Sequence, residues 1–168
     1  KFEQLYLTYR QTMFYVANSV LHDTQLAEDA VHQAFLRIMD HMGNISKIEC
    51  PQTKSFVVII VKNIAINLYN RRKKQAVLSF DELADWSVER IASPGNEIES
   101  REEYDCLIEL IGQMPESYRS VLLLKYDNGY STAEIASMLN LTEENVKKRI
   151  QRARKKLEQI LDTEGVNI

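Results

Sequence analysis

The sequence predicts an all-α protein, and two observations support this fold class. The chain of 168 residues contains only 5 Gly and 3 Pro, where average usage would give about 20. So few turn-forming residues argue against sandwiches and barrels, which need a turn roughly every 8–12 residues. Apolar residues also recur at spacings of three and four, which is the pattern of a helix with one buried face.

Two amphipathic helices are expected in the N-terminal third. The first stripe is followed by Asp23-Thr24, which offers an N-cap for the second helix. Residues 43–54 contain Gly, Asn, Ser and Pro and predict a loop. The two stripes comprise Leu5, Tyr9, Met13, Val16, Ala17 and Val20, and then Leu26, Ala27, Ala30, Val31, Ala34, Phe35 and Ile38.

Residues 55–69 are ambiguous in type. Their run of Val and Ile suits a buried strand by propensity. The 15 unbroken residues, continuing into Asn63, Asn67 and Arg71, favour a buried helix.

An acidic stretch divides the chain. Residues 75–105 carry nine acidic and two basic groups, and Ser93-Pro94-Gly95-Asn96 is a dense turn signal. We therefore expect two small helical domains, residues 1–75 and 97–168, joined by a flexible acidic linker at 76–96. Ser79-Phe80-Asp81-Glu82 fits a capping box and predicts a short helix within the linker.

The C-terminal domain has the pattern of a helix-turn-helix. Helices are expected at 97–112 and 115–127, and Asn128-Gly129 ends the second. Ser131-Thr132-Ala133-Glu134 is a capping box for a short helix to Leu139. After a tight turn, Thr142 caps a long basic helix. Two helices joined by a short turn, the second one basic, are typical of DNA-binding proteins.

The charge distribution points to nucleic acid, although the net charge is -3. Residues 62–74 carry five basic groups and no acidic one, and residues 147–156 carry seven and no acidic one. The second of these basic segments lies on the predicted recognition helix, whose N-terminal residues reach base edges in the major groove. Those residues are Thr142, Glu143, Glu144, Asn145, Lys147, Lys148, Arg149, Gln151 and Arg152.

The sequence gives little support for an enzyme. His22, His32 and His41 are nine or ten residues apart, which does not suit metal ligands on one helix. Cys50 and Cys106 cannot form a disulfide framework or a zinc site. No phosphate-binding loop is present. We therefore expect no catalytic site, no metal, no cofactor and no small-molecule substrate, and a reducing, cytoplasmic compartment.

These motifs resemble those of an extracytoplasmic-function (ECF) sigma factor of bacterial RNA polymerase, the sigma-70 group that has regions 2 and 4 only. The C-terminal likeness lies in Met114-Pro-Glu-Ser-Tyr-Arg, Tyr130-Ser-Thr-Ala-Glu-Ile-Ala and Asn145 to Leu157. The N-terminal likeness lies in Leu5-Tyr6, Ala27-Glu-Asp-Ala-Val31, Phe35-Leu36, Asn63-Ile-Ala-Ile and Arg71-Arg72. The likeness covers nearly the whole chain.

The resemblance implies roles for three groups of residues. The recognition helix would read the −35 promoter element. The residues expected to bind and help melt the −10 element are Lys62, Asn63, Asn67, Asn70, Arg71, Arg72, Lys73 and Lys74, and the loop at 43–54 would hold a flipped-out base. The residues expected to dock on the β′ clamp helices of core polymerase are Asp29, His32, Gln33, Phe35 and Leu36.

The resemblance also implies binding partners, and the sequence differs from the usual family pattern at a few positions. The β flap, promoter DNA and an anti-sigma factor, in some cases membrane-anchored, are the expected partners of a chain that is monomeric when free. The family's usual Gln is replaced by His32, and its usual Asp and Arg by Asn67 and Asn70.

The competing hypotheses are a helix-turn-helix regulator with a sensor or dimerisation domain at 1–75, a nucleic-acid-processing enzyme, and an interaction protein.

Overall fold

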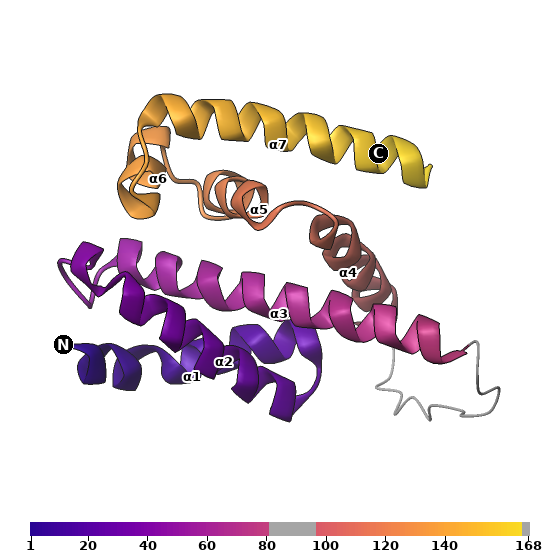
Figure 1. The fold of residues 1–168 in the computed structure, drawn as a ribbon, viewed down its shortest axis with the longest axis horizontal. Helices are drawn as coiled ribbons and strands as arrows, with labels where there is room; N and C mark the ends of the chain where they lie inside the picture. The colour runs from indigo at the N-terminus through magenta and orange to yellow at the C-terminus, as the bar shows by residue number, and fades with distance from the viewer. Residues whose placement is uncertain (81–96, 166–168) are drawn as a thin grey trace.

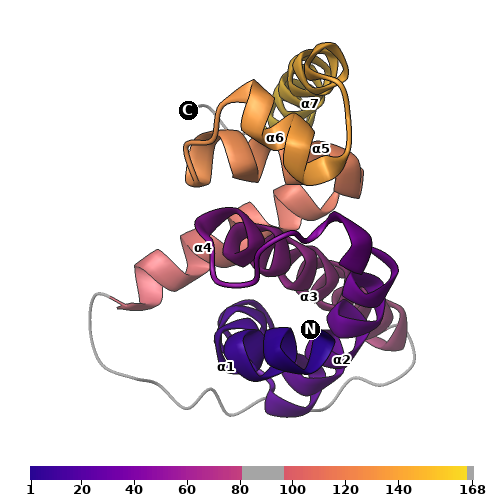
Figure 2. The same ribbon diagram turned by 90° about the vertical axis from the view of Figure 1, so that its left-hand side faces the viewer.

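The computed structural model describes residues 1–80 and 97–165, and all regular structure in these two ranges is helical. Helices α1 (Phe2–Leu21), α2 (Thr24–Asp40) and α3 (Pro51–Phe80) form the N-terminal half. Helices α4 (Glu97–Gly112), α5 (Glu116–Leu122), α6 (Thr132–Leu139) and α7 (Glu143–Glu164) form the C-terminal half. Figures 1 and 2 show α4 and α5 lying between α7 and the three N-terminal helices. The predicted all-α class is confirmed.

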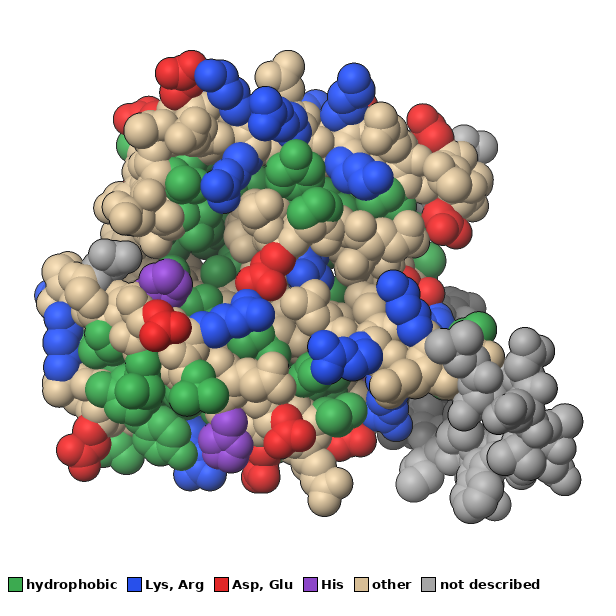
Figure 3. Space-filling view, viewed as in Figure 1, with side chains coloured by type: hydrophobic (Ala, Val, Ile, Leu, Met, Phe, Trp, Pro, Cys, Tyr) green, Lys and Arg blue, Asp and Glu red, His purple; other side chains and the backbone are tan. Residues whose placement is uncertain are grey.

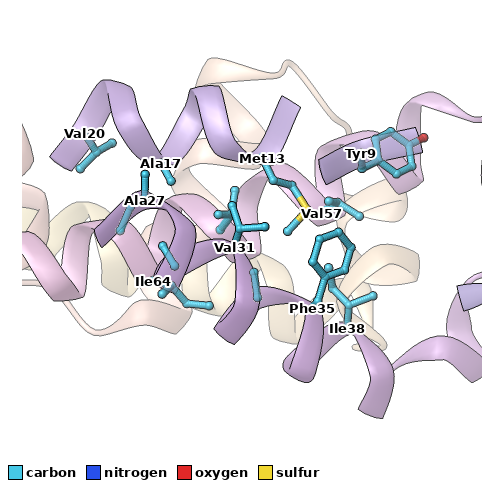
Figure 4. Packing of buried hydrophobic residues seen from close by; sticks show 14 of the residues in the cluster. Tyr9, Met13, Ala17, Val20, Ala27, Val31, Phe35, Ile38, Val57 and Ile64 are labelled. Carbon is cyan, nitrogen blue, oxygen red and sulfur yellow. The ribbon is translucent and has the colours of Figure 1, made fainter. Parts of the chain in front are cut away.

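The three N-terminal helices enclose one hydrophobic core. The predicted stripes of α1 and α2 face α3, and Met13, Val31 and Val57 are among the side chains that meet there (Figure 4). The Asp23 carboxylate accepts a hydrogen bond from the Leu26 N–H at 3.1 Å, so the predicted N-cap of α2 is confirmed. The connection before it is tight because His22 adopts φ 50°.

The ambiguous segment at 55–69 is helical, as favoured, but α3 is longer than predicted at both ends. It begins at Pro51, which needs no N–H partner in a first turn, so the loop is shorter than 43–54 and also contains a 3-10 turn at Met42–Asn44. It continues to Phe80, so the first five residues of the predicted linker are helical. Ser79 is inside α3 and does not begin a new helix, whereas Asp81 and Glu82 lie outside the described residues.

The helix-turn-helix is formed by α6 and α7. Ser131 and Glu134 form the predicted capping box, and the Thr142 hydroxyl accepts from the Asn145 N–H at 3.2 Å. Asn140 makes the turn between the helices with φ 53°. The helix predicted at 115–127 is divided, because α5 passes into a wider π turn at Leu123–Asp127 whose final hydrogen bond runs from the Asn128 N–H to the Leu123 carbonyl.

Candidate nucleic-acid interface

Helix α7 presents a buried apolar stripe on one side and cations on the other. Val146, Ala153 and Ile160 are buried against the rest of the C-terminal half. The predicted −35 residues are exposed, apart from the half-buried Arg149. Figure 3 shows Lys and Arg side chains gathered over α7 at the top of the molecule. Lys148 is held by Glu144, 2.6 Å away and one turn earlier, so the remaining cations give this helix its positive face.

The predicted −10 residues lie on α3 in three different environments. Asn67 and the four cations Arg71, Arg72, Lys73 and Lys74 are exposed, Lys62 and Asn70 are half-buried, and Asn63 is buried. Arg72 pairs with Asp23 at 3.2 Å and Lys73 pairs with Glu109. The Lys73–Glu109 hydrogen bond raises the pKa of the Lys73 ammonium. The side chain of Lys62, earlier in α3, is also engaged with another group. The cations at the end of α3 therefore reach solvent, and two of the four are partly neutralised by ion pairs.

Asn63 is buried, with 1% of its surface exposed. Its amide donates to the Ser120 hydroxyl at 2.8 Å, and its side-chain oxygen has no hydrogen-bond partner among the described residues. Asn67 accepts from the Arg119 guanidinium at 2.6 Å. The structure thus places two predicted −10 residues against α5 of the same chain.

The predicted polymerase surface on α2 is separated by burial into two sets. Asp29, His32, Gln33 and Leu36 are exposed, and 65% of the Leu36 surface is accessible. Phe35 is buried at 4% and contacts the rings of Phe2 and Tyr6. Its place in the apolar stripe decides its environment, so Phe35 packs in the core and is not part of the accessible surface.

Sequence reasoning missed the contacts that join the two halves. Oε1 of Glu116 in α5 lies 2.7 Å from Nη1 of Arg37 in α2. The Tyr130 hydroxyl oxygen lies 2.7 Å from the Ser55 hydroxyl oxygen of α3. Arg119 is 2% exposed. The sequence showed the motif at 114–119, but the spacing of its residues does not indicate that Glu116 and Arg119 contact the N-terminal helices.

The described residues contain no group of three or more His, Cys, Asp and Glu side chains arranged to hold a metal ion. Within the same residues, no helix is both long and apolar enough to cross a membrane. Cys50 and Cys106 are both free thiols.

The chain matches two family models that together span most of its length. Residues 5–75 match sigma-70 region 2, and residues 104–157 match sigma-70 region 4. The first range contains α1, α2 and most of α3, and the second contains the helix-turn-helix. The chain belongs to the sigma-70 family.

Relatives named as extracytoplasmic-function (ECF) sigma factors align with nearly the whole of this chain. This sigma factor is 26% identical to the ECF RNA polymerase sigma factor SigM of Bacillus subtilis, over 98% of this chain and 97% of the relative. It is also 26% identical to RNA polymerase sigma factor SigZ of the same organism, over 95% and 86% of the two chains.

Two solved structures are similar to this chain. The sigma factor RpoE of Bartonella quintana, crystallised with the anti-sigma factor NepR, has a TM-score of 0.47 at 17% identity, covering 96% of each chain. CnrH in complex with the cytosolic domain of CnrY has a TM-score of 0.49 at 22% identity, covering 96% of this chain and 88% of that one.

This sigma factor binds core RNA polymerase and directs promoter-specific transcription initiation. Its family consists of initiation factors and not of enzymes. The regulator with a sensor domain at 1–75 is excluded, because those residues match region 2.

Proposed function

We propose that α7 reads the −35 element and that α3 binds the −10 element. The observation that carries the first assignment is the exposed face of α7 opposite Val146, Ala153 and Ile160. A helix-turn-helix places this face in the major groove. There, Asn145 and Gln151 can read adenine, and Arg152 can read guanine or neutralise a phosphate.

The −10 assignment rests on the C-terminal half of α3. Arg71 and Lys74 are exposed cations. The nearby Asn67 amide accepts a hydrogen bond from Arg119 and donates one to Glu116. A basic groove with amide and aromatic groups suits single-stranded bases. The amides here are those of Asn67 and Asn70, which line a pocket with Arg71 and Lys74, whereas the ring of Tyr69 lies on the other side of α3 against the N-terminal core.

On the polymerase, we propose that Asp29, His32, Gln33 and Leu36 contact the β′ clamp helices, with the β flap as a second contact. These four α2 side chains lie on one exposed side of the helix, and Leu36 provides an apolar centre. We also propose that an anti-sigma factor regulates the protein and that the protein is cytoplasmic. We propose further that the free protein is a monomer, and light scattering after size exclusion will check this oligomeric state.

Run-off transcription with purified core polymerase and genomic DNA tests the assignment. The wild-type chain should give specific transcripts. Arg152→Ala should weaken binding to the −35 duplex and lower the slope of log affinity against log salt by about one. Arg10→Ala removes an exposed cation of α1, outside the helix-turn-helix, and is the matched control for binding to the −35 duplex. Specific transcripts that are unaffected by Arg152→Ala and Asn145→Ala would contradict the role of α7.

A further inference from the structure

Two side chains of α7 occupy the centre of the face opposite its buried stripe. Glu144 and Lys148 are each two residues from the buried Val146, so at about 100° per residue each lies about 160° round the helix from it. Both project into solvent, since 76% of the Glu144 side chain and 57% of the Lys148 side chain are exposed. Thr142 caps the helix just before them, so they belong to the N-terminal turns that reach base edges in a helix-turn-helix.

These two side chains form an ion pair in the free chain. Oε1 of Glu144 lies 2.6 Å from Nζ of Lys148, one turn further along the helix. An exposed pair of this kind adds little to helix stability. A carboxylate at the centre of a DNA-facing surface also repels phosphates. Helix stability alone therefore gives only a weak reason for an acid in this place.

The ion pair presents an acceptor and a cationic donor side by side, and a G·C base pair presents the complementary groups. In the major groove, guanine offers N7 and O6 as acceptors, and cytosine offers its N4 amino group as a donor. N4 and O6 are hydrogen-bonded to each other, so they lie about 2.9 Å apart. This separation is close to the 2.6 Å between Oε1 of Glu144 and Nζ of Lys148. The carboxylate can therefore accept from N4 while the ammonium donates to O6 or N7.

The other base pairs fit this arrangement less well. A C·G pair reverses the order, so the carboxylate would face O6 and the ammonium would face the N4 amino group. An A·T pair places its N6 donor between two single acceptors, N7 of adenine and O4 of thymine, and adds a methyl group beside O4. The ammonium then lacks the two neighbouring acceptors that guanine offers.

We propose that the Glu144–Lys148 pair reads one G·C base pair of the −35 element in one orientation, with the carboxylate on cytosine and the ammonium on guanine. The proposal rests on the −35 role of α7 proposed above, and it names the base pair that the centre of its exposed face selects. Because the ion pair is formed before DNA binds, its two side chains are already held together and lose less freedom on binding.

A charge swap tests the orientation. Run-off transcription by the holoenzyme is measured on templates of one promoter, found with the wild-type chain, in which each −35 position carries all four base pairs in turn. With wild type, one position should prefer G·C in one orientation by about tenfold over the other three pairs. Glu144→Lys combined with Lys148→Glu keeps the composition of the helix. The swapped chain should prefer the inverted pair, C·G, at the same position.

A second variant covers the case in which the swapped chain does not fold by circular dichroism. Glu144→Ala removes the acceptor and should reduce the preference at that position to within about twofold, because the remaining ammonium can reach an acceptor on any base pair. Glu158→Gln is the matched control. It changes an exposed carboxylate of the same helix, about 21 Å further along, and should keep the wild-type preference at every −35 position.

Two outcomes would overturn the proposal. One is a wild-type profile in which no −35 position favours G·C over C·G. The other is an unchanged preference at that position in both the swapped chain and Glu144→Ala, which would leave the ion pair a role in the helix alone.

The failure of the underlying −35 assignment would look different. In that case Arg152→Ala and Asn145→Ala would also leave every −35 preference unchanged. If those two substitutions alter the −35 preferences but the changes at Glu144 and Lys148 do not, the −35 assignment stands and the reading by the ion pair is wrong.

Discussion

Arg119 is the largest of the fully buried side chains in the described part of the molecule. It has one hydrogen bond, from Nη2 to Asn67, and two nitrogen positions without partners. A buried charge with incomplete pairing contributes little to stability, since its desolvation offsets what its contacts gain. Arg119 therefore adds less to the stability of the contact between α5 and α3 than its deep burial alone would suggest.

We predict that Arg119→Met leaves the free energy of unfolding unchanged or raises it by about 1–2 kcal/mol, because an apolar side chain of similar length removes the desolvation cost. Urea denaturation followed by circular dichroism measures the change. Ser120→Ala is the comparison. It leaves the buried Asn63 amide without its partner and should lower stability by about 1–3 kcal/mol. A large loss of stability in Arg119→Met would show that the guanidinium is a net stabilising group.

Single residues show where sequence reasoning succeeded and where it did not. Phe35 belonged to two predictions at once, the apolar stripe of the second helix and the polymerase surface implied by the resemblance. The helical period placed it correctly in the core, since burial follows from position on a helix. Asn67 lacks such a signal. Its contact with Arg119 joins residues 52 positions apart, and no local pattern specifies such a pair.

Among the elements, α6 depends most clearly on one local interaction. The Glu134 carboxylate accepts hydrogen bonds from the Ser131 N–H and hydroxyl, both at 2.8 Å. These bonds, with the backbone one first, hold the pKa of Glu134 below its usual value. The folded pKa is depressed, so the stability that this box contributes is present above the unfolded pKa and is lost as pH falls through the folded one.

We predict that Ser131→Ala raises the pKa of Glu134 only part of the way toward its usual value, because the hydroxyl bond is lost and the backbone N–H bond remains, and that it weakens the start of α6 at neutral pH. An NMR titration of the Glu134 side chain in both chains measures the shift. Amide resonances of α1, in the other half of the molecule, should be unchanged. An unchanged Glu134 titration would mean that the Ser131 hydroxyl does not affect this carboxylate.

Element boundaries differed from prediction where the cause lay outside the local sequence. Val and Ile in α3 favour strands by propensity, yet a helix buries them on two sides, against α1 and α2 and, through Ile59, against the C-terminal half. Caps at Asp23, Ser131 and Thr142 were predictable because a side chain three residues before its N–H partner is visible in sequence. The π turn at Leu123–Asp127 is not marked by any Gly or Pro.

For the whole molecule, the exchange of Ile59 and Ile108 links the two hydrophobic clusters. We predict that Ile108→Ala lowers the free energy of unfolding by about 2–5 kcal/mol. Its effect should also reach the N-terminal helices, because Ile108 packs among them. Hydrogen exchange will show this as faster exchange of α1 amides. Leu107→Ala, at a 48% exposed neighbour, should leave α1 protection unchanged. Faster exchange confined to α4–α7 would contradict the linkage.

The net charge of the chain conceals its organisation. The 23 residues of the two basic segments carry +12, so the remaining 145 carry −15. The sequence showed this division, but not that Lys73 and Arg72 of the first segment pair with Glu109 and Asp23. Such neutralisation reduces the field available for DNA.

The position of Ile59 also matters while the chain is being made. Synthesis proceeds from the N-terminus, so α1, α2 and α3 leave the ribosome before Leu110, Met114 and the other residues that bury Ile59 exist. During that interval, α3 presents an apolar surface that only later segments of the same chain can cover. The order of synthesis therefore leaves this face of α3 exposed in every new molecule until the C-terminal helices have been made.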